Sequence, residues 1–135
     1  MAISGKRALA GVLIVVVAAA VTTGIVIIGS PGEERTRRLD TRRVSDLRQI
    51  SQSVEVYHTR QQRVPASLDE LSQEPGLAIG ARDPVTGQPY GYRNIDSGSY
   101  ELCAIFDRET TEVRSDFWSH GSGMQCFTLT MKQTK

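Results

Sequence analysis

The first 32 residues of this chain contain no acidic side chain, and their only basic ones are Lys6 and Arg7. The whole chain of 135 residues has a formal net charge of +1, and without these two it has 14 basic side chains against 15 acidic ones. A near-neutral remainder lacks the clustered positive charge that binds phosphate backbones. We therefore expect no nucleic-acid partner.

Catalytic motifs are also lacking. Ser67, Ser119 and Ser122 have no nucleophile setting such as GxSxG, and nothing in the spacing pairs His58 or His120 with a cysteine nucleophile. We therefore predict that the protein is not an enzyme and has neither a catalytic residue nor a cofactor.

Metal-binding patterns are weak as well. The two cysteines lack the CxxC spacing of a zinc site. Asp83, Asp96 and Asp107 could ligate a cation, but turn formation already explains aspartates at such positions. We predict no metal site.

A long apolar stretch, residues 8–28, organises the N-terminal part of the chain. Its 21 residues carry no charge and no proline, and as a helix they would extend about 31 Å, close to the thickness of a bilayer core. We predict a short tail at residues 1–7 followed by a transmembrane helix at 8–28, with the lipid bilayer as its partner. The alternative is a signal peptide cleaved after the small residues 18–20. Against cleavage, the apolar run continues from Val21 to Ile28.

Features on the two sides of the span favour opposite orientations in the membrane. Five arginines follow it closely, namely Arg35, Arg37, Arg38, Arg42 and Arg43. The positive-inside bias alone would place the domain after the span in the cytoplasm. The short tail and the cysteine pair favour the opposite orientation. We predict a single-pass cell-membrane protein with a cytoplasmic N-terminus and an extracytoplasmic domain.

Residues 29–32, Gly-Ser-Pro-Gly, predict a break in the helix, and residues 33–135 are expected to form one domain. A long amphipathic helix should begin near Glu33 and end between 61 and 64, before Pro65. Its apolar stripe comprises Leu39, Val44, Leu47, Ile50, Val54 and Tyr57. Asp40, Asp46 and Glu55 alternate with arginines and are expected on a solvated face. The arginines could alternatively contact anionic headgroups.

The rest of the domain is predicted to be a short helix and a few strands. Ser67 and Glu70 fit a capping box for a helix over 67–71, and residues 83–89 read as a fixed loop. Two-residue alternation predicts strands at 90–92, 100–107 and 124–131, with a short one near 112–114. Antiparallel strands covering the apolar stripe of the long helix would give an α+β domain.

Strand parity predicts a disulfide between Cys103 and Cys126. If Leu102 and Phe127 face the long helix, both cysteines point away from it and lie on one face of neighbouring strands. Such a bond would persist only outside the reducing cytoplasm. The alternative is a pair of buried free thiols.

Aromatic residues gather near the C-terminus. Phe117, Trp118 and Phe127, together with His120, could form a recognition patch, but a core role is the simpler interpretation.

Four segments, residues 42–50, 54–57, 64–71 and 83–92, occur in an order that resembles type IV pilin-like proteins. The likeness is greatest to major pseudopilins of type II secretion, in which a DP, a glycine and a PYxY segment follow a long N-terminal helix. It covers about residues 8–106. The resemblance implies an anchored helix packed on an antiparallel sheet, with members assembling into filaments through their N-terminal helices.

The chain departs from that family at the processing site. Family prepilins carry a glycine followed by Phe-Thr-Leu-Ile-Glu, whereas here Gly5 is followed by Lys6 and Arg7. We predict a membrane-anchored pilin-like structural or assembly protein of type IV pilus or type II secretion-like machinery, with other pilin-like subunits or a secretion platform as partners. The alternative is an anchored extracytoplasmic binding or sensing domain without a filament role.

Overall fold

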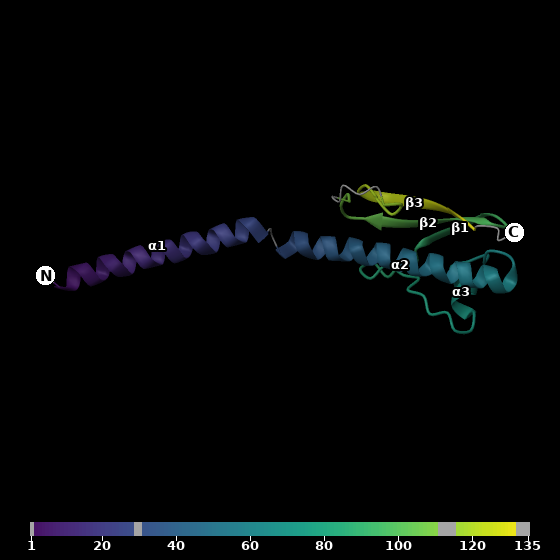
Figure 1. Cartoon of the computed structure of the whole chain (residues 1–135), viewed down its shortest axis with the longest axis horizontal. Coiled ribbons are helices and arrows are strands. Elements are labelled where there is room, and N and C mark those ends of the chain that lie inside the picture. The colour runs from purple at the N-terminus through teal and green to yellow at the C-terminus, as the bar shows by residue number, and fades with distance from the viewer. Residues whose placement is uncertain (1, 29–30, 111–115, 132–135) are drawn as a thin grey trace. The chain divides into compact units, whose positions relative to one another are not determined.

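The computed structural model describes residues 2–28, 31–110 and 116–131, and the chain divides into two compact units, residues 1–35 and 36–135. The predicted strand near 112–114 lies outside the described residues. Figure 1 shows the elements of both units in chain order.

The N-terminal unit is built around one apolar helix, α1, Ala2–Ile28. From Leu9 to Ile27 its large aliphatic side chains are exposed, up to 81% at Val26. Among the described residues, α1 supplies the one stretch that is long and apolar enough to cross a membrane. The hydroxyls of Thr22 and Thr23 donate to the carbonyls of Ala18 and Ala19 at 2.9 and 2.7 Å, so neither needs a partner from solvent.

A second long helix, α2, spans Pro31–Gln61. Proline suits a first helical position because its missing N–H would have no partner there, and Glu33 and Glu34 lie in the first turn, where the helix dipole favours acids. Gln62 has a positive φ of 56°, and its N–H donates to the His58 carbonyl at 2.8 Å. The predicted end of the helix, ahead of Pro65, is confirmed.

A three-stranded antiparallel sheet, in the order β1-β2-β3, supplies the second layer (Figure 1). Its strands are β1 Gly91–Asp96, β2 Ser99–Phe106 and β3 Gly123–Thr130. β2 is central and alternates strictly, with Tyr100, Leu102, Ala104 and Phe106 buried. The long helix and the small antiparallel sheet therefore give the predicted α+β class.

The core lies between α2 and the inner face of the sheet. Leu47, Ile50 and Val54 of α2 are fully buried in one cluster with Tyr100 and Leu102 of β2. Leu39 and Val44, at the start of the predicted stripe, are half-buried. Because burial follows the three- and four-residue spacing of the helix, the stripe predicted from periodicity is the face that packs.

A short helix, α3 Leu68–Gln73, adds Leu68 and Leu71 to this core. Ser67 caps it as predicted, and its hydroxyl oxygen accepts from the Glu70 N–H at 3.2 Å. The returning half of the expected capping box differs, because the Glu70 carboxylate accepts from the N–H of Ala66 at 2.5 Å.

Candidate functional site

A buried and strongly charged site is centred on Arg43, whose side chain is only 4% exposed. Its Nε donates to Asp83 Oδ2 at 2.5 Å, and its Nη1 donates to Asp40 Oδ1 at 2.7 Å and to Asp107 Oδ2 at 2.6 Å. Three carboxylates from α2, the 83–89 loop and the end of β2 therefore share one guanidinium. We call these four residues the Arg43 cluster.

Two members of the Arg43 cluster, Arg43 and Asp83, have shifted pKa values. Burial opposes the charge on Arg43, but its hydrogen bonds to the three carboxylates outweigh that effect and raise its pKa further above the ordinary value. Burial likewise opposes ionisation of Asp83, but the bond from Arg43 and the backbone N–H groups of Thr86 and Val85 lower its pKa to about 2. Arg43 and Asp83 therefore both stay charged near neutral pH.

Backbone groups complete the cluster. Asp40 accepts from the N–H groups of Asp107 and Arg108 at 3.1 and 2.9 Å, which fixes the chain where it leaves β2. Asp83 Oδ1 accepts from the N–H groups of Val85 and Thr86, which closes the predicted loop. These carboxylates act as acceptors that join separate segments of the domain.

Asp46 forms a second buried contact between α2 and the sheet side. Its Oδ2 accepts from the Tyr90 hydroxyl at 2.9 Å, and its Oδ1 pairs with Arg42 Nε at 3.0 Å. Burial and this hydrogen bond both raise the pKa of Tyr90. The backbone at Gly80 packs closely here, because a Cβ at that position would lie 3.4 Å from the Asp46 carboxylate.

The prediction that the charged residues of α2 lie on a solvated face is therefore wrong at three positions. Asp40, Arg43 and Asp46 are all buried. The i, i+3 spacing of Asp40 and Arg43 gave a local signal for one ion pair. Nothing in the sequence indicated that Asp83 and Asp107, 40 and 64 residues further along, would reach the same guanidinium.

The three aspartates considered as cation ligands do not meet. Asp83 and Asp107 bind Arg43, whereas Asp96 lies in the β1–β2 turn and accepts from the Gly98 N–H at 2.8 Å. Arginine occupies the position that a cation would need between Asp83 and Asp107.

A smaller cluster joins the end of α2 to α3. The Glu70 carboxylate accepts from Arg63 Nη2 at 2.5 Å and from the Tyr57 hydroxyl at 2.7 Å. These two bonds and the Ala66 N–H lower the pKa of Glu70 to about 2. The Arg63 guanidinium also lies over the Tyr57 ring, 5.4 Å from its centroid.

Of the residues considered for catalysis, Ser67 and His120 have contacts of other kinds. Ser67 caps α3, and His58 lies half-buried in α2. The His120 ring stacks on Phe106, with centroids 3.6 Å apart, and its backbone N–H donates to the Thr110 hydroxyl at 3.0 Å.

The aromatic residues divide between core and surface. Phe127 is buried and Trp118 half-buried, with ring centroids 5.0 Å apart, whereas Phe117 is 55% exposed and packs edge-on against Trp118. A core role therefore holds for Phe127 and in part for Trp118, but not for Phe117.

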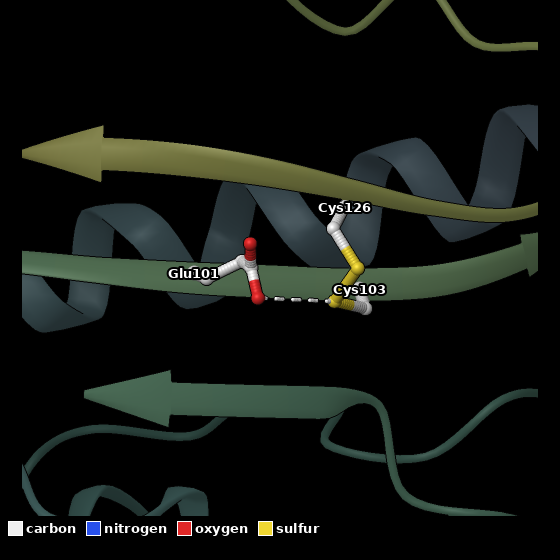
Figure 2. Close-up of side chains that lie close together, drawn as sticks. All are labelled: Glu101, Cys103 and Cys126. Atoms are coloured by element: carbon white, nitrogen blue, oxygen red, sulfur yellow. Dashed lines mark hydrogen bonds between the residues drawn. A yellow bond between two sulfur atoms is a disulfide. The ribbon is translucent and has the colours of Figure 1, made fainter. Parts of the chain in front are cut away.

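The disulfide between Cys103 and Cys126 lies on the sheet face that points away from α2. The two cysteines are direct partners in the β2–β3 register, with Cα atoms 4.1 Å apart. The side chain of Glu101, two residues earlier on β2, lies beside the disulfide (Figure 2). Its Oε2 is 3.9 Å from Cys103 Sγ. A disulfide sulfur has no proton to donate, so this approach is a contact only. The place of Glu101 beside the disulfide was not predicted from the sequence, although its two-residue spacing from Cys103 placed both side chains on one face of the strand.

Comparisons with known proteins give no assignment: no protein-family model, no curated protein and no solved structure matches the chain. A function for this protein therefore has to be inferred from its own sequence and geometry.

Proposed function

We propose that this protein is a single-span membrane protein whose pilin-like outer domain has a structural or assembly role in type IV pilus or type II secretion-like machinery. The observation that carries the proposal is the pairing of elements in one chain. An apolar helix, α1, precedes an amphipathic helix, α2, which packs on a small antiparallel sheet. The order of the segments at 42–50, 54–57, 64–71 and 83–92, which resembles pseudopilins, supports the same class.

The apolar surface of α1 indicates that this helix lies in a hydrophobic environment. Side chains such as Leu13, Val16 and Ile25 are more than half exposed, and they point to different sides of the helix. Leaving so much apolar surface in water is unfavourable by about 25 cal/mol per Å². Lipid, or the α1 helices of other subunits, would remove that exposure.

For the topology, we propose a cytoplasmic N-terminus and an extracytoplasmic domain. The Cys103–Cys126 disulfide supports this orientation because such bonds persist in oxidising compartments. The arginines that follow α1 favour the reverse on the positive-inside rule. Protease added outside intact cells tests the orientation: we expect loss of the domain, and full protection would reverse the topology.

A second candidate, an anchored binding or sensing domain, is favoured by one specific observation. Residues 2–28, which form α1, contain no acidic side chain. In pilin-like families, the glutamate of the Phe-Thr-Leu-Ile-Glu segment guides filament assembly. That glutamate has no counterpart in this helix.

Site-specific photocrosslinking separates the two candidates. A photoreactive residue replaces Val15 of α1, which is 68% exposed, and the matched control replaces Gln52 on the exposed side of α2. Expression in cells that carry pilus or secretion machinery should give protein adducts at position 15 to pilin-like subunits or platform proteins. Adducts to lipid alone, together with a failure to co-isolate with the inner-membrane platform, would favour the anchored domain.

A further inference from the structure

Three potential metal ligands meet on the outward face of the sheet. One carboxylate oxygen of Glu101 and the two sulfurs of Cys103 and Cys126 all lie within 4.8 Å of one another (Figure 2). Glu101 and Cys103 are alternate residues on β2, and Cys126 is opposite Cys103 on β3. Paired strands hold all three positions in a fixed relation.

The disulfide by itself gives no role to Glu101. The carboxylate is 20% exposed and also pairs with Arg93 on β1, with Nη2 and Oε2 3.0 Å apart. That partner is 71% exposed, so the guanidinium can move away into solvent when another cation approaches.

We propose that in the reduced protein Glu101, Cys103 and Cys126 bind one soft divalent cation of the Zn²⁺ type. Two thiolates and a carboxylate form a ligand set that Zn²⁺ accepts, at about 2.3 Å for sulfur and about 2.0–2.2 Å for oxygen. Tetrahedral angles then place the sulfurs about 3.8 Å apart. Side-chain rotation can supply that separation without moving strands whose Cα atoms are 4.1 Å apart.

Metal binding and the disulfide exclude each other, because both use the same two sulfurs. A small-molecule dithiol or a thiol–disulfide oxidoreductase reduces the bond: two electrons and two protons convert the disulfide to two thiols. The cation then displaces both protons. In reverse, a disulfide oxidant accepts two electrons from the thiolates, takes up two protons to become two thiols, and leaves a protein disulfide and a free cation.

Such a site would protect the thiols of the newly made chain until an oxidant acts on it. One cation would be released for each disulfide formed. Three protein ligands also leave a fourth position open to water.

Cobalt is the probe for this site, because thiolate coordination gives Co²⁺ an intense near-ultraviolet absorption that Zn²⁺ lacks. The full chain in detergent is reduced with a phosphine, freed of reductant without oxygen, and titrated with Co²⁺. We expect one Co²⁺ per chain, displacement by Zn²⁺, and release of the cation when a disulfide oxidant is added.

Two substitutions test the ligand set. Glu101→Gln should weaken Co²⁺ binding at least tenfold. The control is Glu55→Gln, which removes an exposed carboxylate on α2 and should leave Co²⁺ binding unchanged. Circular dichroism of each reduced sample shows whether the domain is folded. If the reduced wild type is unfolded and Co²⁺ does not restore its circular dichroism signal, the paired strands that the site requires are absent and the proposal is overturned.

Three further results would overturn the proposal. The first is the absence of a thiolate band in a folded, fully reduced chain. The second is half a Co²⁺ per chain, which would indicate a bridge between two copies. The third is an equal Co²⁺ affinity of the wild type and Glu101→Gln, which would show that the two cysteines bind the cation without the carboxylate.

Discussion

Arg43 joins three separate parts of the domain. Replacing it with methionine keeps much of its volume but leaves Asp40 and Asp83 buried without their cation. Breaking a buried ion pair from one side costs about 3–5 kcal/mol. We expect Arg43→Met to lower the free energy of unfolding by that amount, measured by urea unfolding with Trp118 fluorescence.

Arg42 provides the matched control for Arg43. Its side chain is 67% exposed and pairs with the buried Asp46. Because the Arg42 cation lies in water and Asp46 keeps its bond from Tyr90, this pair should contribute less than the buried pairs of Arg43, about 1 kcal/mol. Equal losses for Arg42→Met and Arg43→Met would show that the Arg43 cluster does not stabilise the domain.

Removing the hydroxyl group should have different effects on stability at two buried tyrosines, Tyr90 and Tyr100. The hydroxyl of Tyr100 is buried without a hydrogen-bond partner among the described residues, whereas that of Tyr90 donates to Asp46. Removing an unsatisfied group should be neutral or stabilising, and removing one partner of a buried bond should cost about 1–3 kcal/mol. Urea unfolding should therefore rank Tyr100→Phe at or above wild type and Tyr90→Phe below it.

The pH dependence of stability should depend in part on Asp83. Its pKa of about 2 in the folded protein lies below the ordinary 3.8, so the native state binds the proton less well than the unfolded chain. The resulting stabilisation is complete above about pH 4 and is lost as the pH falls through about 2. The stability gap between wild type and Asp83→Asn should narrow over that range, and a constant gap would contradict the assignment.

At the scale of elements, the contact of α2 with the sheet is expected to contribute most of the stability. Ile50 is fully buried at its centre, and Ile50→Asp would place a carboxylate among apolar side chains. The loss should be several kcal/mol, a large part of the about 5–15 kcal/mol available to a whole domain. Thermal unfolding followed by circular dichroism measures the loss.

A matched control for Ile50→Asp comes from the same helix. Gln52 is exposed, and Gln52→Asp should change stability by less than about 1 kcal/mol. Arg48, although also exposed, is less suitable because it pairs with Asp116. Similar losses at positions 50 and 52 would mean that α2 is not packed through its apolar stripe.

At the scale of the whole molecule, processing distinguishes an anchored chain from a secreted or pilin-processed one. The residues after Gly5 differ from the prepilin pattern, so we expect intact mass spectrometry of protein from native membranes to show that Lys6 and Arg7 are retained. Without reductant, both cysteines should resist alkylation. A mature form starting at Lys6 would indicate prepilin-type cleavage after Gly5, and one starting at Val21 would indicate secretion.

The sequence by itself determined the elements of this protein, because each depends on local periodicity. The apolar run at 8–28, the three- and four-residue spacing from Leu47 to Tyr57 and the alternation around Leu102 all have the expected structures. Parity extended this reasoning to the Cys103–Cys126 disulfide, since strand faces follow from position alone.

Only the tertiary structure decided which charged side chains are buried. Asp40 and Asp46 have the same local pattern as solvated helix residues, and their burial depends on a loop and a strand end that the fold brings to α2. Long-range pairing of this kind leaves no periodic trace, because the contacting residues are separated by tens of positions. The Arg43 cluster emerged from that packing.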